Sequence, residues 1–97
     1  MGEELEVMSK IEKAQLIRKI FSEKGGARFS WNDDVGRICA TEALYQARAL
    51  ALQGEIDIIA TAMFGREIMW VNDELGKEEV LQVFDKYIAR LEEGWNG

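Results

Sequence analysis

Four carboxylates in two short turns are the residues of this 97-residue chain best placed to do chemistry. Asp33 and Asp34 follow one asparagine, and Asp73 and Glu74 follow another. If the two turns were adjacent, these oxygens could bind a divalent cation, which prefers such ligands. However, position 35 holds valine, and no glutamate stands where an EF-hand loop needs one. Because aspartates in turns usually bond their own backbone, we predict no metal and keep these residues as weak candidates.

The residues that build most small active sites are missing. The chain has no histidine and no proline, and its one cysteine is Cys39. Without imidazole there is no Ser-His or Cys-His pair and no His-bearing zinc site. A helix start just after Cys39 would lower the pKa of its thiol, but its apolar neighbours favour a buried structural cysteine. We therefore predict a protein that is not an enzyme and has no cofactor.

The charge balance restricts the partners. Eighteen acidic residues against twelve basic ones give a net charge of −6, and no basic stripe suits nucleic-acid phosphates. A protein partner with a basic surface fits better. No apolar run approaches the roughly 20 residues of a membrane-spanning helix, and the acidic N-terminus lacks the features of a signal peptide. We expect a cytoplasmic protein that binds neither nucleic acid nor membrane.

The first predicted helix begins after Ser9. Ser9-Lys10-Ile11-Glu12 matches the S-x-x-E capping box. Apolar residues then recur on one helical face: Ile11, Ala14, Ile17 and Phe21, with Leu16 and Ile20 alongside. Gly25 and Gly26 end the helix, because glycine tolerates the left-handed position after a helix. Residues 1–8 form either a frayed extension or a continuation of the helix.

Residues 27–38 carry turn signals and no helical period. Asn32-Asp33-Asp34 before Gly36 is typical of a tight turn. The flanking apolar residues permit a short hairpin, and a second extended connector is expected near residues 66–72. Trp31 and Trp70 lie within apolar stretches, which favours a place in the core for both.

Three further segments are predicted to pack. An Ala-rich helix should run from about residue 38 to 53 and end at Gly54, with a packed face that includes Ala40, Ala43, Leu44, Ala47 and Leu50 or Ala51. Residues 55–64 indicate a buried helix, and residues 68–73 a buried connector. The clearest helix runs from Lys77 to about Glu93, with Val80, Phe84, Tyr87 or Ile88, and Leu91 inward. The chain is thus predicted to be one all-α domain, a compact bundle of about four helices with a tail at 95–97.

Two motifs point to a family. One is Gly36-Arg37-Ile38-Cys39-Ala40-Thr41-Glu42-Ala43-Leu44, and the other is Ile68-Met69-Trp70-Val71-Asn72-Asp73, followed by Glu79-Val80-Leu81. Together they resemble a small helical domain family of unknown function found in actinobacterial and phage genomes. The resemblance covers about residues 9–93. It implies a helical fold and a bacterial or phage origin, and it brings no activity.

Several residues are candidates for a partner surface. Trp95 follows the helix-ending Gly94, where it either folds back on the bundle or protrudes as an interface anchor. Tyr45 and Arg48 could join such a surface. The last helix carries the acidic candidates at its two ends: Glu78, Glu79, Glu92 and Glu93.

The preferred hypothesis is a small acidic protein-binding module, in its concrete form a phage or mobile-element protein that modulates a host factor by occupying its surface. One alternative is a self-associating structural protein that uses apolar residues of the 55–71 stretch in a symmetric homo-oligomer. The other is a divalent-metal site built from the carboxylates named first.

Overall fold

The computed structural model describes residues 8–96 and is all-α, as predicted. The expected extension at 1–8 lies outside this range except for Met8, and so does the last residue of the predicted tail. The helices are α2 (Lys10–Lys24), α3 (Ala40–Gln46), α4 (Gln53–Phe64), α5 (Ile68–Trp70) and α6 (Lys77–Glu92), with a 3₁₀ turn η1 (Leu50–Leu52) and a π turn η2 (Val71–Leu75). Within residues 8–96, no helix is long and apolar enough to cross a membrane.

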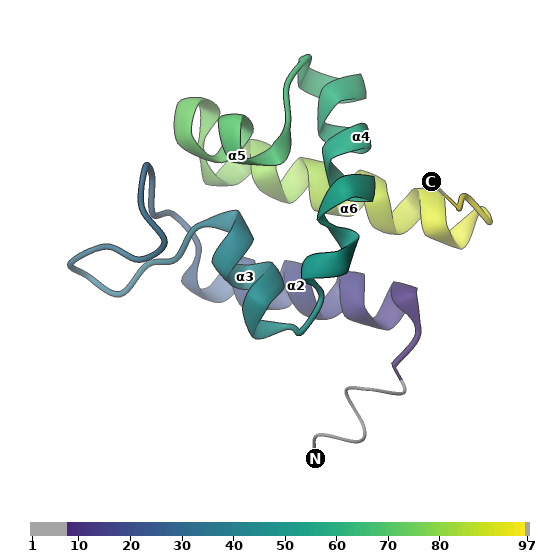
Figure 1. The fold of residues 1–97 in the computed structure, drawn as a ribbon, viewed down its shortest axis with the longest axis horizontal. Coiled ribbons are helices and arrows are strands. Elements are labelled where there is room, and N and C mark those ends of the chain that lie inside the picture. Colours follow the sequence, from purple (N-terminus) through teal and green to yellow (C-terminus); the bar gives the residue numbers. More distant parts are fainter. Residues whose placement is uncertain (1–7, 97) are drawn as a thin grey trace.

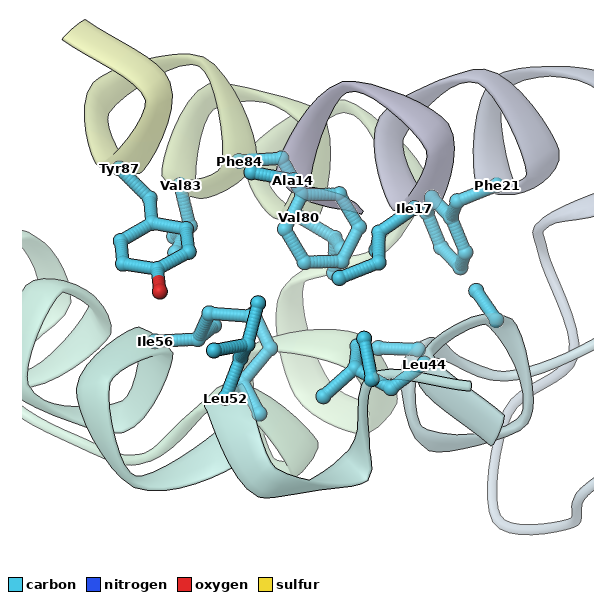
Figure 2. Packing of buried hydrophobic residues seen from close by; sticks show 14 of the residues in the cluster. Ala14, Ile17, Phe21, Leu44, Leu52, Ile56, Val80, Val83, Phe84 and Tyr87 are labelled. Atoms are coloured by element: carbon cyan, nitrogen blue, oxygen red, sulfur yellow. The ribbon is translucent and has the colours of Figure 1, made fainter. Parts of the chain in front are cut away.

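The helices form two layers. The two longest, α2 and α6, lie antiparallel and side by side, and α4 crosses α6 (Figure 1). Figure 2 shows apolar side chains of both layers pointing into the space between them. Within this core the rings of Phe21 and Phe84 meet edge to face, with centroids 5.6 Å apart. Burial of such side chains is the main stabilising contribution to a fold of this size.

The start of α2 is confirmed in detail. The Ser9 hydroxyl accepts a hydrogen bond from the Glu12 backbone at 3.1 Å, and the Glu12 carboxylate accepts one from the Ser9 backbone at 2.8 Å. The helix ends before Gly25, as expected. The expected reason was a left-handed backbone at this glycine, but Gly25 has φ −70°, which is not left-handed. A Cβ there would lie 2.5 Å from the Phe21 carbonyl oxygen. The left-handed backbone falls on Gly26, with φ +133°.

The single helix predicted over residues 38–53 is wrong. The structure ends α3 at Gln46, because Arg48 adopts φ +55° and turns the chain into η1. Gly54 does not end a helix as was expected, because it lies in the first turn of α4. Alanine content favours helix but cannot reveal a break at an arginine. The buried helix at 55–64 is confirmed as α4, which ends at Gly65 with φ +83°.

Both predicted extended regions differ from the structure. The connector at 66–72 is helical, because α5 continues directly into η2 and buries Ile68 and Val71. The hairpin at 27–38 is reduced to isolated bridges, which join Ile38 to Gly25 and to Asn32. Among the described residues no segment forms a strand.

The last helix, α6, is confirmed, with Val80, Phe84, Tyr87 and Leu91 buried. Trp95 folds back on the bundle and packs edge to face on Tyr87, with ring centroids 6.1 Å apart. The two alternatives for Trp95 are thereby decided in favour of packing.

Candidate functional site

A loop at residues 28–37 (below, the apolar loop) exposes large apolar side chains. Phe29 is 71% exposed, Trp31 54% and Val35 75%. The loop projects away from the two helical layers (Figure 1). The prediction that Trp31 lies in the core is therefore wrong, because more than half of its side chain is exposed on this loop. Trp70, by contrast, is half-buried and packs against the core.

A buried asparagine secures the base of the apolar loop. Asn72 is only 2% exposed. Its Oδ1 accepts a hydrogen bond from the backbone N–H of Ala40 at 3.0 Å, and its Nδ2 donates to the Ala27 carbonyl at 2.9 Å. Because a buried amide must be satisfied, this side chain fixes three segments together: the start of the loop, the start of α3, and η2.

Two further hydrogen bonds join the loop to η2. The backbone N–H of Phe29 donates to Asp73 Oδ1 at 2.8 Å, and Arg28 Nη2 donates to the Leu75 carbonyl at 2.8 Å. Phe29 has φ +60°, a conformation that is costly for a bulky aromatic residue. The loop thus holds an exposed ring in a strained backbone geometry, and long-range hydrogen bonds maintain it.

The tip of the loop is organised by Asp33. Its Oδ1 accepts the backbone N–H groups of Val35 at 3.1 Å and Arg37 at 2.8 Å, and its Oδ2 lies 2.6 Å from Arg37 Nε. Partial burial alone would raise the pKa of Asp33, but these hydrogen bonds and the Arg37 guanidinium outweigh it and lower that pKa. On the far side of the loop, the Trp31 carbonyl accepts the Cys39 backbone N–H at 2.9 Å.

The four carboxylates proposed as weak metal candidates do not form one site. Asp73 bonds the Phe29 backbone at the base of the loop, whereas Asp33 faces Arg37 at its tip. Asp34 and Glu74 are exposed. Within residues 8–96, no group of three or more aspartate, glutamate, cysteine or histidine side chains could hold a metal ion.

Cys39 is buried, as predicted, at 1% exposure. Its Sγ lies 3.3 Å from the backbone nitrogen of Glu42 and caps α3 as a weak acceptor. Burial raises the pKa of its thiol despite this helix position. This is the environment of a structural cysteine rather than a reactive one.

A second exposed region lies where α3 meets η1 (below, the α3 corner). Tyr45, Gln46, Arg48, Leu50 and Ala51 line an open hollow of about 540 Å³. Tyr45 and Leu50 are 59% and 43% exposed. Two of the candidates named from the sequence, Tyr45 and Arg48, therefore lie together. The predicted packing of Leu50 or Ala51 is wrong, because the break in the helix turns both outward.

The backbone of the α3 corner forms a Schellman motif. The N–H of Ala49 donates to the Leu44 carbonyl at 2.8 Å, and the N–H of Arg48 donates to the Tyr45 carbonyl at 3.0 Å. An apolar contact often accompanies this motif, and both Ala49 and Leu44 are buried members of the hydrophobic core. Arg48 therefore occupies the left-handed position that helices usually give to glycine.

The acidic candidates on α6 are not one cluster. Glu78 and Glu79 lie in its first turn, and Glu92 and Glu93 at its end. Glu92 lies 14 positions after Glu78 along the helix, which corresponds to about 21 Å. Glu79 is half-buried and the other three are exposed. Trp95 packs near the second pair but on the core, so the structure does not join it to an acidic surface.

The apolar stretch at 55–71 contributes chiefly to the core of the single chain. Ile56, Ile59, Ala60, Ile68 and Val71 are all buried. The most exposed large apolar side chain of this stretch is that of Ile58, which is 52% exposed. The surplus of apolar residues that suggested a symmetric interface is thus largely used within the fold.

Sequence reasoning missed Phe29 and Val35 as exposed apolar residues. The signal was available, because a segment rich in turn residues lies at the surface, and its aromatic residues then lie there too.

Comparison of the chain with protein-family models, with curated proteins and with solved structures gave no match. The resemblance to the actinobacterial and phage family stays a prediction.

Proposed function

We propose that the protein is a small protein-binding module whose main contact surface is the apolar loop. The observation that carries this proposal is the exposure of Phe29, Trp31 and Val35 on a loop anchored by Asn72 and Asp73. Exposed large side chains that gather in one segment mark interaction surfaces. An anchored loop also loses less conformational entropy on binding than a free one.

The energetics suit recognition by burial of aromatic residues. Full burial of one large apolar side chain contributes about 1.5–3 kcal/mol. Phe29 and Trp31 lie two positions apart in the loop, and Val35 follows across the Asp33 turn. Tryptophan is also among the residues that dominate binding energy at interfaces. Three such side chains are sufficient for a compact set of anchors.

The charges favour a partner with an apolar pocket in a basic surface. Within the apolar loop, two arginines balance two aspartates, so the loop itself is neutral. The whole chain carries −6, which attracts a basic surface and accelerates encounter at low salt. In this proposal the acidic residues at both ends of α6 contribute to that long-range attraction without forming the contact.

The more specific hypothesis is that the chain is a phage or mobile-element protein that modulates a host factor. This hypothesis depends on the resemblance to the actinobacterial and phage family.

Self-association is the second candidate function, because two copies could bury their apolar loops against each other. Its own test is the mass in solution at tens of micromolar, measured by light scattering.

The test is quantitative affinity capture from a lysate of the source cell or its host. The bait is the full chain in three forms: wild type, Phe29→Gly with Trp31→Ser, and the matched control Ile58→Ser, which alters an exposed apolar residue outside the loop. We expect a protein that wild type and Ile58→Ser retain equally and that the loop variant loses.

Two results contradict the proposal. The loop variant could retain the same proteins as wild type, or all three baits could retain nothing above background. Circular dichroism of each bait before capture ensures that loss of binding is not loss of fold.

A further inference from the structure

The α3 corner combines chemical groups that the loop lacks. Its hollow brings together a phenol ring, an amide, a guanidinium and an apolar side chain, from Tyr45, Gln46, Arg48 and Leu50. Its volume of about 540 Å³ lies within the range of small-molecule sites. Arg48 is the charged member of the set, so the ligand that complements the hollow is an anion.

Arg48 is available for a ligand. Within residues 8–96, no carboxylate forms an ion pair with its guanidinium, and no carbonyl accepts a hydrogen bond from it. In contrast, Arg18 and Arg37 are each paired with an aspartate. Gln46 donates one of its two amide N–H groups to Glu42 at 3.0 Å, so Arg48 provides most of the side-chain donors of the hollow, and the Tyr45 hydroxyl adds another.

The position of Arg48 supports a role in binding. It occupies the left-handed site of a Schellman motif, where glycine would be less strained. A non-glycine residue kept at such a position is an observed outlier from which a functional hypothesis can be drawn. The geometry directs this inference toward the guanidinium, because the Arg48 side chain is exposed.

We propose that the α3 corner binds a small organic carboxylate that carries an aromatic or branched apolar group. Guanidinium and carboxylate match as two parallel hydrogen bonds. The Tyr45 ring and Leu50 provide the surface on which the apolar group packs. This site is independent of the apolar loop, so it stands or falls separately from the proposed protein-binding function.

The test uses N-acetylphenylalanine as probe, observed through backbone amide NMR signals of the full chain. We expect saturable shifts at residues 45–51 in the millimolar range. The matched probe N-acetylphenylalaninamide lacks the carboxylate and should bind at least tenfold more weakly. Phe29→Gly, which alters only the loop, should bind the acid like wild type.

Variants at position 48 separate the guanidinium from the fold. Arg48→Gly should keep the Schellman motif and abolish the shifts, and Arg48→Lys should retain a part of the affinity. Equal binding of acid and amide, shifts outside the corner only, or no saturable shift would overturn the proposal. So would markedly tighter binding of a peptide that ends in phenylalanine, because the site would then be one for polypeptide C-termini.

Discussion

The apolar loop and the α3 corner each hold a non-glycine residue at positive φ, yet the two are stabilised in opposite ways. Phe29 is held by groups 44 residues and more along the chain, because its N–H donates to the Asp73 carboxylate and the neighbouring Arg28 side chain donates to the Leu75 backbone carbonyl. Arg48 is held by backbone hydrogen bonds that reach back at most five residues. The loop is thus a product of tertiary structure, whereas the corner is a local motif.

This difference determines how each region responds to change. A mutation in η2 should release the loop, since three of its anchors originate there. The same mutation should leave the corner intact, because its bonds need only the end of α3. Functional surfaces of the first kind are sensitive to distant substitutions, and those of the second kind are not.

The largest expected effect is that of Asn72→Leu. Leucine leaves the buried Ala40 N–H and Ala27 carbonyl without partners, and each such group costs about 1–3 kcal/mol. We expect the free energy of unfolding to fall by about 3 kcal/mol in urea titrations. In this variant, amide hydrogen exchange should accelerate much more at Phe29 than at Ala49. Equal acceleration at both amides would contradict the distinction between a loop held by tertiary contacts and a corner held locally.

Replacing Arg48 with glycine should stabilise the protein. The left-handed backbone costs a non-glycine residue about 1–2 kcal/mol, and the added freedom of the unfolded chain offsets part of this. We expect a net gain of about 1 kcal/mol in urea titrations. Arg48→Ala is the control and should show no gain, since it keeps Cβ. A destabilised glycine variant would refute the Schellman interpretation.

These two substitutions also show how far the sequence could predict the fold. The capping box at Ser9 and the inward face of α6 depend on residues within a few turns, so both were predictable. The break at Arg48 was not, because the usual glycine signal is absent. The burial of Asn72 was not either, because its partners lie 32 and 45 residues away.

The candidate site was predictable only in part, for a related reason. Tyr45 and Arg48 were chosen on a predicted long helix, where residues three positions apart are already neighbours, but the break that turns Leu50 and Ala51 outward beside them could not be predicted. Trp31 was assigned to the core because hydrophobicity alone does not separate core residues from anchors of an interface. The hydrogen bond from the Cys39 backbone N–H to the Trp31 carbonyl holds the backbone of Trp31 and leaves its side chain exposed.

Replacing Phe29 with glycine should have a smaller effect of the same sign. The relief of strain at φ +60° is reduced because a glycine makes the unfolded loop more flexible. We expect a gain of about 0.5 kcal/mol, measured by thermal unfolding beside Phe29→Ala as the control. A loss of more than about 1 kcal/mol would show that the exposed ring stabilises the fold and is not held for a partner.

The smallest expected effect is a local one, on pH. The folded pKa of Asp33 is lowered from its ordinary 3.8, so the Asp33 turn is stabilised above about that pH and loses this contribution as pH falls through the folded pKa. NMR signals of the Val35 and Arg37 amides should therefore titrate below pH 4, and those of Arg48 and Ala49 should not. In Asp33→Asn the titration at Val35 should be absent; its persistence would assign it to another group.

The most direct measurement of the central claim is photo-cross-linking from the apolar loop in a lysate of the source cell or its host. A photoreactive amino acid replaces Val35 in one bait and Ile58 on α4 in the other, both exposed by more than half. The account predicts one discrete adduct with a different protein from position 35, absent from position 58 and lost when Trp31 is changed to serine. An adduct of two copies of this chain, or an adduct from position 58 alone, would contradict it.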